Sequence, residues 1–341
     1  MSAIQLVLPV EDDTPCSTVF SHLGAEHSWG RGILGFLTLE DTISLRTTCK
    51  EIRDEIGRFP WNDSQTFVTG DLRVWRFHFP RAKAINISLR NDMYDEEFEY
   101  LQSCHTVNMS WCTSLTNNCF KYLKNVRKLM MHGCHDFTDD AFQYLENLEV
   151  LEMNHCTGIT DVGLRHLKKL KVLSINHCYQ TAITDRGFEH MTGLEELTMD
   201  ECYQLTLTDN LFVPMKSLRK LNMSDCLQFT DRAFQHLQNL ETLDMAFCRQ
   251  DGITDRAFSY LKNLKKLRIS RCNQPTITNK VFDYLGGLKE LTMIGCHQLS
   301  LLEASKLKAK IIDQLSLPES SKMKAKLIRQ RVRRLKTHRT F

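Results

Sequence analysis

Cysteine and histidine, the side chains that most often bind zinc, stand next to each other at several places in this sequence. Examples are His155-Cys156, His177-Cys178 and the cluster His-Gly-Cys-His at residues 132–135. A tetrahedral zinc site usually includes a closely spaced cysteine pair, and the sequence contains no C-x-x-C. A cysteine that turns into a core also points away from the histidine before it. We therefore expect no metal site and no cofactor.

A catalytic cysteine is not indicated either, because the cysteines recur as a regular series. Their spacing is 22 or 24 residues throughout, so no single thiol stands out as a nucleophile. The sequence also contains no Walker loop, no G-x-S-x-G and no H-E-x-x-H motif. We predict that the chain is not an enzyme and has no catalytic residues. The recurring cysteines are Cys112, Cys134, Cys156, Cys178, Cys202, Cys226, Cys248, Cys272 and Cys296.

Each of these cysteines belongs to a repeated unit, of which LEVLEMNHCTGITDVGLRHLKK at residues 148–169 is typical. Leu151 and Met153 alternate with polar residues, which indicates a short strand with one buried face. The Thr160-Asp161 pair suits the start of a helix, and two leucines three residues apart would form the apolar side of that helix. A single unit cannot bury its own inner face, so the units must stack.

The unit is similar to the cysteine-containing class of leucine-rich repeats, whose pattern is LxxLxLxxCxxITDxGLxxL. The similarity covers residues 82–302, about ten units, and includes one unit in which Arg90 replaces the cysteine. It implies an α/β fold, a right-handed leucine-rich-repeat solenoid of horseshoe shape, preceded by a small all-helical module. The cysteines would then be buried, reduced thiols.

The segment at residues 29–63 contains ILGFL, then LRTTCKEIRDEI, and then Trp61. It resembles the F-box, a three-helix motif that binds the Skp-type adaptor of cullin-based ubiquitin ligases. The resemblance implies a substrate-recognition subunit of an SCF-type ligase, with a Skp-type adaptor and cullin ligase subunits as partners. A helical cap on the first repeat is the alternative structure, and a repeat scaffold without ligase recruitment is the alternative function. The residues that would bind the adaptor are Ile33, Leu34, Leu37, Ile43, Leu45 and Cys49.

The outward residues of the strands would line the concave face of the solenoid and bind a target protein. These residues change along the array, whereas the core positions do not. The series starts with aromatic and imidazole side chains, continues with carboxylates and ends with arginines. Aromatic residues and arginine contribute most of the binding energy at many protein interfaces. The predicted target-binding residues are Trp111, His132, His155, His177, Asp200, Glu201, Asp225, Asp244, Phe247, Arg268 and Arg271.

Composition and charge limit the classes of protein that fit. Hydrophobic residues make up 42% of the 341 residues and charged residues 25%, values that are ordinary for a globular protein. The sequence has no apolar run long enough for a membrane span, and its acidic N-terminus does not resemble a secretory signal. We expect a reducing compartment, cytoplasmic or nuclear, in a eukaryotic cell or in the host cell of a virus. We expect no obligate homo-oligomer.

The positive net charge of the chain comes from its last residues. Residues 318–341 carry nine Lys or Arg and one Glu, which is typical of a solvated tail, a nuclear-import signal or a weak nucleic-acid contact. We favour the solvated tail and expect no nucleic-acid partner. The predicted segments are an N-terminal extension at 1–28, the F-box-like module at 29–63, a rigid linker at 64–81, the repeats at 82–302, a cap helix at 303–317 and the basic tail at 318–341.

Overall fold

The computed structural model describes residues 3–5, 44, 54 and 57–312, and the chain divides into two compact units. Unit 1 spans Met1–Leu194 and unit 2 spans Glu195–Phe341. The predicted adaptor-binding residues, from Ile33 to Cys49, lie outside the described residues, and so does the basic tail at 318–341. The F-box therefore stays a prediction.

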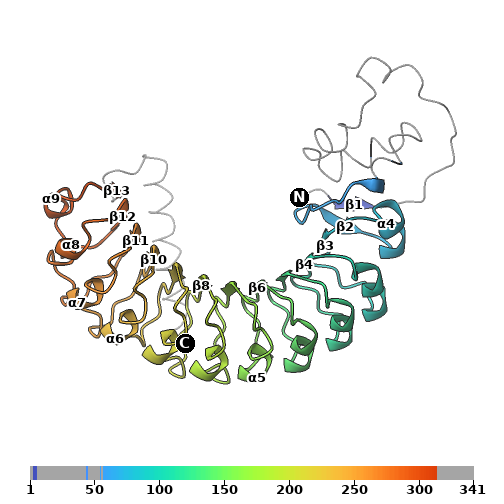
Figure 1. The fold of residues 1–341 in the computed structure, drawn as a ribbon, viewed down its shortest axis with the longest axis horizontal. Helices are drawn as coiled ribbons and strands as arrows, with labels where there is room; N and C mark the ends of the chain where they lie inside the picture. Colours follow the sequence, from blue (N-terminus) through green and yellow to red (C-terminus); the bar gives the residue numbers. More distant parts are fainter. Residues whose placement is uncertain (1–2, 6–43, 45–53, 55–56, 313–341) are drawn as a thin grey trace, which may run out of the picture. The chain divides into compact units, whose positions relative to one another are not determined.

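Unit 1 contains a parallel sheet whose strands follow one another in chain order. Figure 1 shows the strands on one face of the unit and short helices on the other. We call the surface formed by the strands and the residues just after them the strand face. The strands are β1 (Ala3–Gln5), β2 (Phe67–Thr69), β3 (Ala84–Asn86), β4 (Thr106–Asn108), β5 (Lys128–Met130), β6 (Val150–Glu152) and β7 (Val172–Ser174). The helices, with η marking the 3-10 type, are α4 (Leu72–His78), η2 (Asp95–Leu101), η3 (Asn117–Tyr122), η4 (Asp139–Tyr144), α5 (Asp161–Leu164) and η5 (Asp185–Phe188).

Unit 2 has the same architecture, with parallel strands in chain order and one short helix between each pair of strands. Its strands are β8 (Glu196–Thr198), β9 (Lys220–Asn222), β10 (Thr242–Asp244), β11 (Lys266–Arg268), β12 (Glu290–Thr292) and β13 (Lys310–Ile312). Its helices are η6 (Asp209–Phe212), α6 (Asp231–Phe234), α7 (Asp255–Phe258), α8 (Val281–Tyr284) and α9 (Leu301–Ala304).

A column of leucines fills the core behind the strands. Leu151, at the centre of β6, is completely buried, whereas Glu152 beside it is only half-buried. In the parallel register Leu151 aligns with Leu129 of β5 and Leu173 of β7. Complete burial of a leucine side chain contributes about 1.5–3 kcal/mol, so this column is a main source of stability. The predicted strands and their inward leucines are confirmed.

The helices are shorter than the sequence pattern suggested. Helix α5 ends at Leu164, and Leu167 lies in the turn that follows, although both leucines are buried. The chain must reverse its direction twice within each repeat of 22 or 24 residues. This leaves room for little more than one helical turn, which explains why several of these segments are 3-10 helices.

The Thr-Asp pairs join successive repeats as well as starting helices. The hydroxyl of Thr160 accepts a hydrogen bond from the N–H of Val162 at 3.2 Å, as a helix cap should. The carboxylate of Asp161, which we expected to act on the helix dipole, also accepts two hydrogen bonds from Thr184 of the next repeat. These come from the Thr184 N–H at 2.7 Å and from its hydroxyl at 2.6 Å. The same two bonds join Asp139 to Thr160 in unit 1, and Asp209 to Thr230, Asp231 to Thr254 and Asp255 to Thr278 in unit 2.

The repeat cysteines form a second column, and their predicted burial is confirmed. Each of the eleven cysteines within the described ranges is a buried thiol, outside any disulfide. The thiol of Cys156 donates a hydrogen bond to the carbonyl of Met131 in the preceding repeat, at 3.0 Å. In unit 2 the thiol of Cys248 donates in the same way to the carbonyl of Met223, at 3.2 Å. The cysteines therefore satisfy backbone carbonyls in the core.

The ends of the repeat array differ from the expectation. Lys310–Ile312 forms strand β13, so the cap helix predicted for 303–317 is wrong at these residues. Ile311 pairs with Leu291 of β12, because the sheet edge offers unpaired backbone groups and isoleucine favours strands. At the other end, β1 lies within the predicted N-terminal extension and pairs with β2. The predicted linker at 64–81 contains β2 and α4. No helix among the described residues is both long and apolar enough to cross a lipid bilayer.

Candidate functional site

The residue just before the cysteine position of each repeat has a left-handed backbone. Its φ angle lies between 55° and 63° at the non-glycine residues and is 65° and 76° at the two glycines. We call these residues the edge row, because they follow the last strand residue at one margin of the strand face. In unit 1 the edge row consists of Leu89, Trp111, Gly133, His155 and His177, and in unit 2 of Glu201, Asp225, Phe247, Arg271 and Gly295.

This backbone conformation is unfavourable for most residues other than glycine, by about 1–2 kcal/mol. Hydrogen bonds between repeats hold it in place. The N–H of Trp111 donates to the carbonyl of His132 at 2.8 Å, and that of Phe247 to the carbonyl of Ser270 at 2.8 Å. Gly133 and Gly295 occupy the same position in their repeats, so the turn needs no side chain there. The large side chains of the edge row are therefore not required by the fold.

In unit 1 the edge row forms a series of stacked rings. The Trp111 ring lies 6.2 Å from that of His155, and the His155 and His177 rings are parallel, with their centroids 4.5 Å apart. The hydroxyl of Tyr179 lies 3.1 Å from Nδ1 of His177. Because these contacts restrict each ring, the series presents a preorganised aromatic surface.

Gly133 makes room for the indole of Trp111. A Cβ atom placed on Gly133 would lie 2.2 Å from the Trp111 ring, so no other residue fits without moving the indole. Trp111 covers this glycine and still keeps 44% of its surface exposed. The glycine and the tryptophan thus act together, a pairing that the sequence pattern does not predict.

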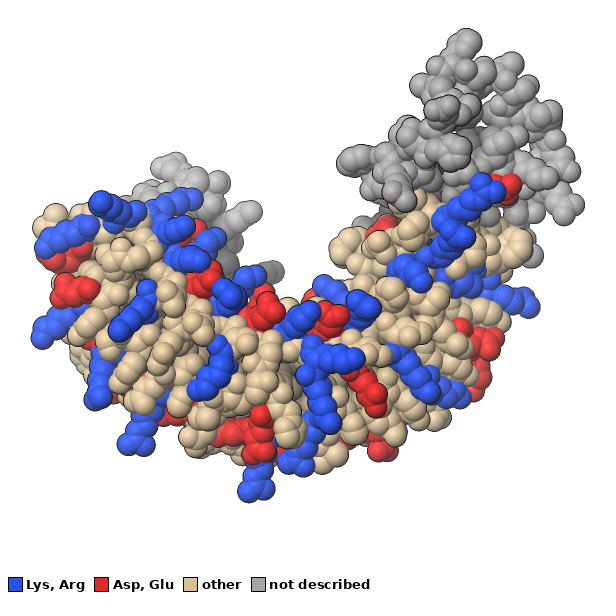
Figure 2. All heavy atoms as spheres, viewed as in Figure 1, with Lys and Arg blue, Asp and Glu red and all other residues tan. Residues whose placement is uncertain are grey.

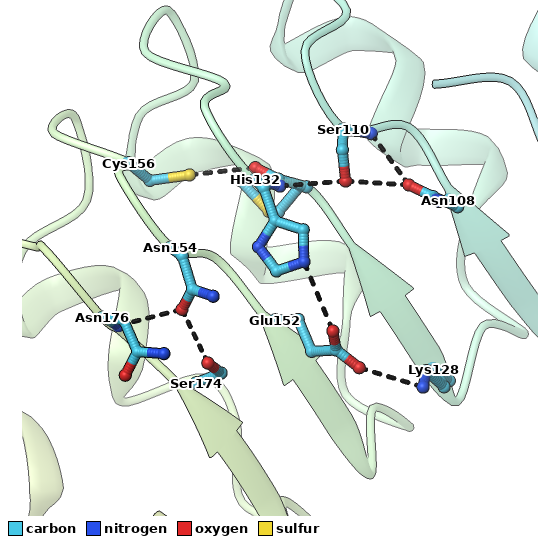
Figure 3. A network of polar contacts seen from close by, with 10 residues as sticks. Asn108, Ser110, Lys128, His132, Glu152, Asn154, Cys156, Ser174 and Asn176 are labelled. Carbon is cyan, nitrogen blue, oxygen red and sulfur yellow. Dashed lines mark hydrogen bonds and ion pairs between the residues drawn. The ribbon is translucent and has the colours of Figure 1, made fainter. Parts of the chain in front are cut away.

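His132, another predicted target-binding residue, belongs to a different group on the strand face. Nε2 of His132 lies 3.3 Å from a carboxylate oxygen of Glu152, and Nζ of Lys128 lies 2.9 Å from the other oxygen (Figure 3). The hydrogen bond from His132, together with Lys128, lowers the pKa of Glu152 to about 2. His132 is thus an internal partner of Glu152 and is separate from the stacked rings.

Several polar residues of the predicted binding surface serve the backbone. Asn108 accepts hydrogen bonds from the N–H and the hydroxyl of Ser110, at 3.1 and 2.8 Å. Asn154 accepts from the hydroxyl of Ser174 at 2.6 Å and from the N–H of Asn176 at 2.9 Å (Figure 3). These side chains satisfy backbone groups where the strands end. The edge row is therefore the more informative surface for recognition.

The first part of the unit 2 edge row is acidic. The hydroxyl of Tyr203 lies 3.1 Å from a carboxylate oxygen of Glu201 and 3.4 Å from one of Asp225. Asp200, next to Glu201, is half-buried at the end of the preceding strand region. Tyr203 thus joins two carboxylates of neighbouring repeats.

The later part of the unit 2 edge row combines an aromatic ring with arginines. The guanidinium carbons of Arg249 and Arg271 lie 6.0 and 5.2 Å from the centre of the Phe247 ring. Arg268, the last residue of β11, pairs with Asp244 at 3.1 Å. The structure therefore places Asp244, Phe247, Arg268 and Arg271 in two neighbouring repeats, as the sequence suggested.

The comparison with protein families gives one match over the repeats. The model of the BspA-type leucine-rich repeat region matches six copies, at residues 77–170 and 157–289, which together cover more than half of the chain. The chain belongs to this family. No curated protein sequence matches the chain.

Three solved structures are similar to parts of the BspA-type chain, and one of them has a TM-score above 0.5. The structure of the Toll–Spatzle complex from Drosophila has 14% sequence identity and a TM-score of 0.54, covering 76% of this chain and 40% of that one. The TLR13–ssRNA13 complex has 18% identity and a TM-score of 0.49, covering 76% of this chain and 37% of that one. The internalin inlF from Listeria monocytogenes has 21% identity and a TM-score of 0.42, covering 62% and 70%. The chain spans less than half of the length of the first two.

Two further features of the described part of the BspA-type chain bear on other kinds of chemistry. Burial raises the pKa of Cys112 and of Cys178 to about 12, so these thiols are not nucleophiles near neutral pH. A hollow of about 270 Å³ lies beside Arg127 and Glu149, at the margin where the strands begin. It is small for a drug-sized ligand and contains none of the predicted target-binding residues.

Sequence reasoning found the members of the edge row but missed their conformation. Seven of the eleven predicted target-binding residues lie in this row, in the turn after each strand, whereas the sequence pattern predicts outward residues of the strands. The left-handed turn could have been inferred from the glycines at 133 and 295, because they occupy the same position in their repeats as Trp111 and Phe247. A position that alternates between glycine and large side chains is typical of a left-handed turn.

Proposed function

We propose that this BspA-type leucine-rich-repeat chain is a scaffold that binds a protein partner through its edge row and strand face. The observation that carries the proposal is the occupancy of a left-handed turn by Trp111, His155, His177, Phe247 and Arg271. Glycine would fit this turn without strain, so each large side chain is retained at the expense of a strained backbone. Recognition explains that expense, because aromatic and arginine side chains dominate binding energy at interfaces.

The leucine-rich-repeat architecture supports the same proposal. The core columns hold leucine and cysteine in most repeats, whereas the edge row changes from aromatic to acidic to basic along the chain. Lys and Arg are interspersed with Asp and Glu in each unit on the face drawn in Figure 2. A mixed surface of this kind favours a protein partner over a uniformly charged polymer.

The proposal is tested by replacing edge-row residues with glycine, which the turn accepts. We expect the full-length Trp111→Gly and Phe247→Gly variants to fold, with unchanged circular dichroism, and to lose proteins that co-purify with the wild-type chain. Tyr284→Ala is the matched control, because Tyr284 lies on the helix side and is 46% exposed, similar to Trp111. Retention of the same partners by both glycine variants would refute the proposal.

A second candidate function is the substrate-recognition subunit of an SCF-type ubiquitin ligase. Its support is the resemblance of residues 29–61 to the F-box. Trp61, at the end of that segment, is buried against Phe79 with the ring centroids 6.0 Å apart, which suits a rigid join to the repeats. A pull-down with a purified Skp-type adaptor tests this candidate, with Leu37→Asp as the variant that should abolish binding. Absence of binding by the wild-type chain removes the candidate.

For both candidates we propose that the chain itself makes and breaks no covalent bonds. Any catalysis would come from partners that the scaffold brings close together, by raising their effective concentration. We also propose a reducing compartment, since the buried thiols serve as hydrogen-bond donors in the core.

A further inference from the structure

We propose that a hollow beside Tyr260 in unit 2 binds a neutral sugar in its pyranose form. The hollow has a volume of about 400 Å³, within the range of about 300–1,000 Å³ for small-molecule sites. It lies between two neighbouring repeats, where the chain leaves helices α6 and α7 towards strands β10 and β11. We call it the amide hollow, because three amides line it together with a tyrosine, a serine and a lysine: Gln238, Asn239, Asn263, Tyr260, Ser259 and Lys262.

Two asparagines of the amide hollow are held by the backbone of the preceding repeat and keep their oxygens available. Nδ2 of Asn239 donates to the carbonyl of Lys216 at 2.9 Å, and Nδ2 of Asn263 donates to the carbonyl of Gln238 at 3.0 Å. An amide oxygen can accept two hydrogen bonds, and no described residue donates to the Oδ1 atom of either asparagine. The amide hollow therefore suits a ligand that donates hydrogen bonds at several points, as hydroxyl groups do.

Tyr260 adds an aromatic face beside these amides. It is half-buried, and its hydroxyl forms no hydrogen bond with any described residue. An aromatic ring has a negative face, which attracts the weakly positive C–H groups of a sugar ring, and the phenol hydroxyl can donate or accept a hydrogen bond. The ring and the amides thus match the C–H and O–H groups that a pyranose presents.

The charges of the amide hollow favour a neutral ligand. Among the described residues that line it, Lys262 alone carries a charge, and this lysine is exposed and forms no ion pair within the described chain. A phosphate group is best bound by several charged donors that converge on it, and a calcium or magnesium ion needs carboxylates; the described lining has neither. The ammonium group of a lysine also donates to hydroxyl oxygens. The lining thus favours hydroxyl groups over a strong anion or a metal ion.

The next repeat shows that the fold does not require these polar groups. Tyr284 occupies the position of Tyr260, 24 residues further along the chain. Glycines stand at positions 286 and 287, where the repeat of Tyr260 has Lys262 and Asn263. A Cβ atom at either glycine would meet no atom within 4 Å, so larger side chains would fit there as well. The lysine and the asparagine beside Tyr260 are therefore available for binding and are not needed to form the repeat.

The experiment measures saturation-transfer NMR on the full-length chain with the methyl glycosides of glucose, galactose, mannose and N-acetylglucosamine. We expect transfer to the C–H protons of at least one of these glycosides. Added salt should leave the binding unchanged, because the ligand carries no charge. The methyl glycoside of glucuronic acid, which carries a carboxylate, is measured alongside them.

Two variants locate the binding in the amide hollow. The double variant Lys262→Gly, Asn263→Gly copies the next repeat, so it should fold with unchanged circular dichroism. It should weaken binding by about tenfold or more, because at least two hydrogen bonds are lost. Tyr260→Ala should weaken binding as well. The matched control is Tyr284→Ala, which makes the same change in the repeat that has glycines in place of the lysine and the asparagine.

Three results would overturn the inference. The first is the absence of transfer to all four neutral glycosides. The second is binding that the double variant leaves unchanged, or that Tyr284→Ala weakens equally. The third is transfer to the glucuronic acid glycoside alone, which would indicate an anion site at Lys262. Tyr260→Ala provides the same test if the double variant fails to fold.

A second arm of the experiment identifies the source of the sugar. The immobilised chain is mixed with a glycoprotein whose glycans contain the sugar that binds, and with the deglycosylated form of the same protein. Retention of the glycosylated form alone indicates a glycan on a protein, whereas binding of the methyl glycosides alone indicates a free sugar. This site goes beyond the proposed function, which Trp111→Gly and Phe247→Gly test separately, since neither variant changes a residue of the amide hollow.

Discussion

Replacing Trp111 should reverse the usual order of alanine and glycine in stability. Glycine normally costs about 0.5–1 kcal/mol relative to alanine, because it loses more backbone freedom on folding. At Trp111 the φ angle is 62°, a conformation that costs a residue with a Cβ about 1–2 kcal/mol. Both variants lose the indole and its contacts equally. The difference of these two terms makes Trp111→Gly more stable than Trp111→Ala by about 0.5–1 kcal/mol.

The measurement is urea unfolding of the two variants, followed by far-ultraviolet circular dichroism so that the loss of a tryptophan does not affect the signal. Val162 provides the control, because it is exposed in helix α5. There Val162→Ala should be more stable than Val162→Gly, by about 0.5–1 kcal/mol. If alanine is at least as stable as glycine at both positions, the left-handed strain assigned to the edge row is refuted, and with it the main argument for the proposed function.

Three further predictions test other parts of the structure. Gly133→Ala should lower the free energy of unfolding by about 0.5–1 kcal/mol through the backbone, and by more because the new Cβ would displace the Trp111 indole. It should also shift the tryptophan fluorescence, and an unchanged emission spectrum would contradict this. His132 and Lys128 lower the pKa of Glu152 to about 2 in the folded chain, below the value of 4.5 for an unperturbed glutamate. The ionised Glu152 carboxylate therefore stabilises the fold fully above pH 4.5, and this stabilisation is lost as the pH falls towards 2. Glu152→Gln should remove about 2 kcal/mol of this acid-dependent change, measured by urea unfolding at several pH values, and equal pH profiles for the two proteins would disprove it. Thiol titration with an aromatic disulfide should modify at most Cys16 and Cys49 in the folded chain, because the other eleven of the thirteen cysteines are buried; fast reaction of further thiols without denaturant would contradict their burial.

The parts of the fold that repeat were predictable, because the same residue types recur at the same spacing. Alternation of Leu151 and Met153 with polar residues identified the strand, and the recurring cysteine identified the turn into the core. The repeat pattern predicted the position of a residue correctly even where its type differs. Arg90 occupies the cysteine position of its repeat and is buried there, paired with Asp92 at 2.9 Å. Stacking explains this success: each repeat packs against neighbours of the same design.

The parts that depend on contacts between repeats were harder to predict. The sequence pattern places Asp161 at the start of its own helix and predicts no other role. In the structure its carboxylate accepts two hydrogen bonds from Thr184 of the next repeat, 23 positions away. Likewise, Ile311 and Ile312 fit a helical spacing as well as a strand, and the open edge of β12 decided between the two. Local patterns contain no information about such partners.

In the edge row the backbone conformation does not depend on the identity of the side chain. The hydrogen bonds that fix its backbone come from main-chain groups, as between Phe247 and Ser270, so they do not depend on which side chain occupies the turn. The penalty for the left-handed conformation is likewise similar for most residues with a Cβ. A substitution from one large side chain to another in this row therefore changes the surface while leaving the core columns and their stability nearly unchanged. This independence explains how one backbone presents stacked rings around His155 in unit 1 and an arginine cluster around Phe247 in unit 2, and it is the reason why we propose this row as the surface that recognises a partner.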